Sequence, residues 1–169
     1  MRKLLLIIAL LISVISEAQI QRKFYDFTFG VTSKSQVINY FKTKGNRLRV
    51  PENNRVAVIN VRFGGFDWGV AHFCFYKNKL YQVMFMSSEN DSPKSTLDSQ
   101  WELLNEKFSV KYSRYYLSKF STNNERLFRD SQTHAKIEYS VFEGLWALSL
   151  IYYDIKLFDE KSSFEDDEL

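Results

Sequence analysis

The stretch FCFYKNKLYQVMFM, residues 73–86, decides the fold because it reads as two β-strands joined by a tight turn. Asn78, between the two runs, is typical of such a turn. One parity holds Phe73, Phe75, Tyr81, Val83 and Phe85, and the other holds Cys74, Tyr76, Leu80, Met84 and Met86. A strand with one solvated face would alternate apolar and polar residues. We therefore expect both faces of this hairpin to be at least partly covered.

Two amphipathic helices are predicted, one before this hairpin and one after it. Ser33 followed by Gln36 fits a capping box, and Gly45 fits the left-handed residue that ends a helix. The second helix is predicted to start near Ser92-Pro93, where proline suits the first turn. Its apolar stripe consists of Leu97, Trp101, Leu104 and Phe108.

Four strand-like runs follow each helix, separated by turn residues such as Gly64-Gly65 and Glu143-Gly144. The predicted strands cover residues 46–50, 55–63, 70–76 and 80–87, then 112–120, 125–130, 134–142 and 145–153. The two halves align at a nearly constant offset, although chance similarity between two amphipathic halves is an alternative. The predicted fold class is α+β. We expect a tandem helix plus four-stranded antiparallel meander, with the helices on one face of a single antiparallel sheet.

The ends of the chain set the expected boundaries. Arg2 and Lys3, the apolar run 4–15 and the small residues around Ala18 predict a signal peptide over residues 1–18, cleaved before Gln19. An uncleaved anchor is the alternative. We expect a lead segment over 19–26, a single domain over 27–157 with pseudo-repeats 27–91 and 92–157, and a flexible acidic tail over 158–169. No integral membrane segment is expected after cleavage.

The composition indicates a folded exported domain. Aromatic residues make up 17% of the chain, and the formal net charge is +3. The lone cysteine, Cys74, excludes an intramolecular disulfide, so stability outside the cytoplasm must come from packing. We expect a periplasmic or secreted location and a buried, unreactive Cys74.

The predicted layout, in which a helix followed by a meander occurs twice along the chain, resembles the β-lactamase-inhibitor-protein-like fold. The segment GVTSKSQV, residues 30–37, is similar to the Gly-x-Thr-x-x-x-Gln-Val opening of small outer-membrane assembly lipoproteins of the SmpA type. The chain lacks the lipid-bearing cysteine of the lipoproteins and the disulfides of the inhibitors. The resemblance implies a fold and a habit of binding other proteins through an open sheet face. It assigns no functional residue.

Few residues fit a catalytic or metal site. The two histidines, His72 and His134, have no carboxylate at ligand spacing, so no metal and no cofactor are expected. Cys74 and His72 share a strand face but have no evident orienting third group. Four carboxylates could meet as an acid–base pair, although nothing in their spacing requires it. They are Asp67, Asp130, Glu138 and Asp154.

Basic residues gather at 42–55 and again at 111–129, interleaved with tyrosine. Such strands can hold nucleic acid, but an exported protein rarely meets it, so we expect no nucleic-acid partner. Attraction to an anionic surface, such as lipid headgroups or acidic glycans, is an alternative.

The segment GGFDWG, residues 64–69, is the outstanding candidate site. It is either a wide hairpin turn whose Trp68 folds into the core or a binding loop that presents Phe66, Asp67 and Trp68. Tyr81 and Phe85 of the opening hairpin would add contact area to the binding loop.

These patterns favour an exported, non-enzymatic protein-binding module that uses an open aromatic sheet face and the 64–69 loop. The expected partner is a protein of the cell envelope or the exterior, with a homodimer as an alternative. A hydrolase or isomerase that acts on envelope material with a carboxylate pair is the rival hypothesis.

Overall fold

The computed structural model describes residues 19–50 and 53–166 of the chain. The predicted signal peptide, residues 1–18, lies outside the described residues. The strands are β1 Lys23–Phe24, β2 Phe27–Thr28, β3 Leu48–Arg49, β4 Arg55–Phe63, β5 Phe66–Tyr76, β6 Lys79–Ser88, β7 Glu125–Arg129, β8 Thr133–Phe142 and β9 Leu145–Asp154. The helices are α2 Lys34–Thr43, α3 Lys94–Lys111 and α4 Ile155–Asp166, with 3-10 turns at Ser113–Tyr115 and Ser118–Phe120.

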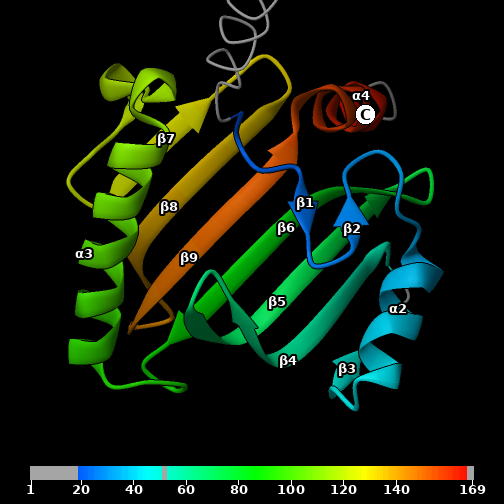
Figure 1. Ribbon diagram of the computed structural model, residues 1–169, viewed down its shortest axis with the longest axis horizontal. Helices are drawn as coiled ribbons and strands as arrows, with labels where there is room; N and C mark the ends of the chain where they lie inside the picture. Colours follow the sequence, from blue (N-terminus) through cyan, green and yellow to red (C-terminus); the bar gives the residue numbers. More distant parts are fainter. Residues whose placement is uncertain (1–18, 51–52, 167–169) are drawn as a thin grey trace, which may run out of the picture.

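A seven-stranded antiparallel sheet forms the centre of the molecule, in the order β3-β4-β5-β6-β9-β8-β7 (Figure 1). The α+β class and the large antiparallel sheet are confirmed. Three neighbouring hairpins close with two left-handed residues each, Gly64-Gly65, Lys77-Asn78 and Glu143-Gly144. This is the backbone that two-residue hairpin turns require, because it matches the twist of the flanking strands.

One face of the sheet, here called the inner face, carries the core. Helices α2 and α3 and the two-stranded β1–β2 hairpin all lie on it (Figure 1). Phe41 of α2 contacts Phe73, and Phe108 of α3 contacts Tyr152. Phe24 of β1 lies between them, against Phe85 and Tyr152. The hairpin therefore fills the gap that the two helices leave.

Both predicted helices form where their signals are. The side chain of Ser33 accepts a hydrogen bond from the backbone N–H of Gln36, whose side chain accepts one from the backbone N–H of Ser33. Gly45 follows α2 with φ of +74°. In α3 the predicted stripe is buried, and Pro93 takes the N-cap, immediately before the first helical residue.

The structure departs from the predicted domain boundaries at both ends. Residues 19–26 are not a separate lead, because Ile20 and Phe24 are buried in the core. Residues 158–166 are not a flexible tail, because they belong to α4. The ring of Tyr153 packs against Phe158 of α4, so this helix packs on the side of the sheet opposite to the core.

Two local predictions are also wrong. Residues 112–120 contain two 3-10 turns rather than a strand, and within them Tyr116 forms an isolated bridge with Phe128 of β7. In the opening hairpin a bulge shifts the register at Tyr81, so that Cys74 pairs with Gln82 and Phe75 pairs with Leu80. The bulge brings Leu80 rather than Tyr81 into register with Phe75 on the inner face.

No helix within residues 19–50 and 53–166 has the length and apolar character needed to cross a membrane.

Candidate functional site

The opposite face of the sheet, here called the outer face, is open over most of its area. Helix α4 packs over one end of it, where Phe158 contacts Tyr81 and Tyr153 (Figure 1). Beyond α4, side chains of β4, β5, β6 and β9 are half-buried. The apolar ones are Ile59, Val70, Met84, Met86 and Ile151.

Strand register places these apolar side chains in adjacent rows. Ile59, Val70 and Met86 pair across β4, β5 and β6. In the next row Met84 of β6 pairs with Ile151 of β9. The outer face thus has a contiguous apolar centre, in place of the aromatic centre that we expected.

Charged side chains flank this apolar centre on both sides. Lys136 and Glu138 of β8 form an ion pair of 2.7 Å on one side. Arg49 of β3 and Arg55 of β4 are exposed on the other. An apolar centre with a polar rim is the usual composition of a non-obligate protein interface.

The four aromatic side chains predicted to bind a partner are buried: Phe66, Trp68 and Phe85 lie in the core, and Tyr81 is covered on the outer face by Phe158 of α4. Phe66 is 8% exposed, Trp68 2%, Tyr81 7% and Phe85 0%. The indole of Trp68 packs against Phe85, and its Nε1–H donates to the carbonyl oxygen of Phe63 at 3.1 Å. Their expected exposure is wrong, and Trp68 takes the alternative in which it folds into the core.

The β4–β5 hairpin buries Phe66, Trp68 and Phe85 by curling over the inner face. Asn60 has φ of +53° and Gly64-Gly65 make the tight turn. The curl brings Phe63 onto Phe85 in a stacked contact, with the ring centroids 4.2 Å apart. Asp67, the fifth predicted site residue, is left exposed on the hairpin.

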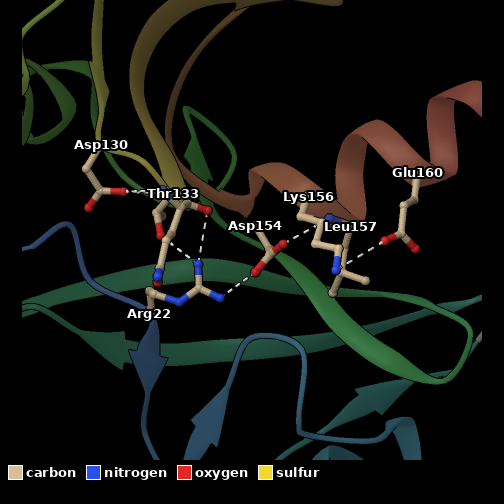
Figure 2. Close-up of polar contacts among 8 residues, drawn as sticks. Arg22, Asp130, Thr133, Asp154, Lys156, Leu157 and Glu160 are labelled. Carbon is tan, nitrogen blue, oxygen red and sulfur yellow. Dashed lines mark hydrogen bonds and ion pairs between the residues drawn. The ribbon is translucent and has the colours of Figure 1, made fainter.

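The structure brings two of the four candidate carboxylates to the same corner, but both are engaged in holding the fold (Figure 2). Asp130 accepts from the backbone N–H groups of Ile20, Gln132 and Thr133 at 2.7–2.8 Å. Asp154 precedes α4, accepts from the N–H of Leu157 at 2.9 Å and pairs with Arg22.

Arg22 joins three distant parts of the chain at this corner. Figure 2 shows its guanidinium between Thr133 and Asp154. It donates to the carbonyl oxygen of Gln132 at 3.0 Å and to Oγ1 of Thr133 at 3.1 Å, besides its ion pair with Asp154. We refer to Arg22, Asp130, Thr133 and Asp154 as the corner network. Its role in the structure is to fasten the N-terminal segment and α4 to the sheet.

A cavity of about 940 Å³ opens beside the corner network, between α4 and the β5–β6 turn. Its charged groups largely face one another. Glu160 lies 3.9 Å from Lys77 and 4.0 Å from Lys156. These charges offset each other, so the cavity presents no strong preference for a cation or an anion.

The other two carboxylates lie far apart in the fold. Asp67 is on the β4–β5 hairpin, and Glu138 is on β8, paired with Lys136. None of the four candidate carboxylates is therefore both free and beside another of the four. The rival hypothesis of an acid–base enzyme finds no support in the geometry.

The histidines and the cysteine show no activated nucleophile. Burial raises the pKa of Cys74 to about 11, outweighing the opposite effect of nearby Arg55 and Lys161. Burial also lowers the pKa of His72, and Arg55 lowers it further. A neutral thiol is a poor nucleophile. Within the described part of the chain, no group of three His, Cys, Asp or Glu residues could hold a metal ion.

A second, apolar cavity of about 590 Å³ lies on the outer face beside the edge strand β3. It is lined by Arg49, Val50, Arg55, Ala57, Ile59, Val70, His72 and Met86, and we call it the His72 pocket. The sequence marked the arginines only as part of a basic cluster and did not place them beside His72. The signal that could have done so is the pairing of β4 with β5, which sets Ala57 opposite His72 and Arg55 opposite Cys74.

Comparisons of the chain with protein-family models, curated proteins and solved structures found no match.

Proposed function

We propose that the chain is an exported, non-enzymatic binding module that binds a protein partner in the cell envelope or outside the cell through its outer sheet face. The observation that carries this proposal is the apolar centre, half-buried but reachable from solvent, which spans Ile59 to Ile151 across four neighbouring strands. Large exposed apolar patches are uncommon on monomeric proteins and mark interaction surfaces.

A protein suits this surface better than a small molecule alone. Four strands about 4.8 Å apart give the centre a breadth that one small ligand would not cover. Methionine at its middle adapts to partners of varied shape. The polar rim of Lys136 and Glu138 would contribute to specificity more than to affinity.

Export is the part of the proposal that rests on residues 1–18. Their order of basic, apolar and small residues is that of a signal peptide. Intact-mass measurement of the natural protein tests it. A first residue of Gln19 would support export, and a mass that retains residues 1–18 would contradict it.

We also propose that the two halves are a duplication, in keeping with the resemblance to β-lactamase-inhibitor-protein-like and SmpA-type proteins. The support is the strand order. The last strands of the two halves, β6 and β9, pair antiparallel at the centre, and each meander is preceded by a helix on the inner face. The departure is at 112–120, where the second half has 3-10 turns instead of a first strand.

A paired pull-down tests the binding surface. The protein and its Met86→Lys variant are used as bait in envelope extract, with Val110→Lys as the control because Val110 is 78% exposed on α3. The proposal expects a stoichiometric protein that is retained by the Val110→Lys variant and lost by Met86→Lys.

Retention of every captured protein by Met86→Lys would overturn the proposal. Sedimentation of the purified protein tests the homodimer. Self-association that Met86→Lys abolishes would make a second copy the occupant of the face and would contradict a foreign partner.

A further inference from the structure

The His72 pocket is an apolar cavity with cationic groups at its edge. Ile59, Val70 and Met86 form one row of its wall, and Ala57 and His72 pair in the adjacent row. Its volume of about 590 Å³ falls within the range of small-molecule sites in proteins. The pocket therefore has the size and lining to enclose an apolar group.

The edge of the pocket carries two positive charges. Arg49 comes from β3 and Arg55 from the start of β4. Among residues 19–50 and 53–166, no carboxylate forms an ion pair with either guanidinium. Arginine binds carboxylates with paired hydrogen bonds, so this edge selects an anionic group.

The floor of the pocket holds a polar atom without a partner. Nδ1 of His72 is buried and makes no hydrogen bond within the described part of the chain. A buried polar atom in this state costs about 1–3 kcal/mol, and most buried polar atoms in proteins are paired. Because this atom has no accessible surface in the pocket, the cationic edge and the apolar wall are the groups that a ligand can contact.

We propose that the His72 pocket binds an aliphatic carboxylate, a molecule of the fatty-acid class. Its carboxylate pairs with Arg49 and Arg55. Its alkyl chain lies against Ile59, Val70 and Met86. An apolar wall and two guanidiniums match the two ends of such a molecule. The site shares Ile59, Val70 and Met86 with the proposed protein interface, but its occupant is different and it is tested by a different experiment.

Calorimetric titration of the purified protein with sodium dodecanoate tests the proposal. Binding at one site per chain is expected, with at least tenfold weaker affinity in Arg55→Gln and in Arg49→Gln. Arg129→Gln is the matched control, because Arg129 is an exposed arginine at the far edge of the sheet, on β7. Its affinity should change less than twofold.

The two histidines give a second readout that does not require loss of binding. In proton NMR spectra, dodecanoate should shift the His72 ring signal and leave that of His134 in place. The proposal is overturned if dodecanoate fails to bind below millimolar concentration or if all three arginine variants lose affinity equally. Equal binding of dodecyltrimethylammonium would also overturn it, since that result means unselective apolar adsorption.

Discussion

Arg22 forms an ion pair with Asp154 across 132 positions of sequence, so the N-terminal segment is locked to the start of the C-terminal helix. The side chain of Asp154 is only 8% exposed, and that of Arg22 is 25% exposed. Removal of one partner from such a pair leaves the other charge poorly solvated.

We therefore expect Arg22→Met to lower the free energy of unfolding by about 2 kcal/mol, as measured by urea denaturation. Lys156→Met is the control, since Lys156 is 85% exposed and its contact with Glu160 is long. The control should change stability by less than about 0.5 kcal/mol. Equal stability of the two variants would show that the corner network does not hold the ends of the chain.

Trp68→Ala separates the core role of this residue from the binding role that its loop suggested. A buried indole that packs on Phe85 should cost about 3–5 kcal/mol when truncated. The melting midpoint should then fall by more than about 10 °C. Phe142→Ala is the control, because Phe142 is 62% exposed, and it should leave the midpoint nearly unchanged. An unchanged melting midpoint for Trp68→Ala would contradict the burial of Trp68 in the core.

Much of the fold can be predicted from local sequence signals. The turns at Gly64-Gly65 and Glu143-Gly144 and the capping box at Ser33 each involve interactions between residues close in sequence, so their composition predicts them. These signals place most strands and both predicted helices. They cannot place the β1–β2 hairpin on the core, because that depends on the gap that α2 and α3 leave between them.

The errors arise where tertiary contacts override composition. Acidic residues near the C-terminus suggested a tail, but Asp154 caps α4 and Phe158 packs on Tyr153. The bulge at Tyr81 exchanges the faces of Tyr81 and Leu80, and no residue in the hairpin signals it. The half-buried apolar centre was predictable from Met84 and Met86, whereas the His72 pocket depends on the register between β3, β4 and β5.

Cys74 should be nearly inert to alkylation in the folded protein. Its pKa, raised by burial to about 11, lowers the thiolate population at pH 8 about 100-fold relative to an ordinary thiol. Iodoacetamide labelling in native buffer and in urea measures the ratio of rates. Because the folded pKa is raised, this thiol favours the folded state below pH about 9, and that contribution is lost as pH rises toward 11. Equal labelling rates in both conditions would contradict the burial.

The last prediction concerns the close approach of Gly69 to Asp91. A Cβ on Gly69 would lie 2.3 Å from Cγ of Asp91, which is held in place by hydrogen bonds to N and Oγ of Ser88 at 2.9 and 3.0 Å. Gly69→Ala should therefore lower stability by about 1–3 kcal/mol. Asp91→Ala removes the obstructing carboxylate, so the double variant should be more stable than the sum of the two single changes predicts. Additive losses in this double-mutant cycle, measured by urea denaturation, would show that Gly69 is required for a reason other than its contact with Asp91.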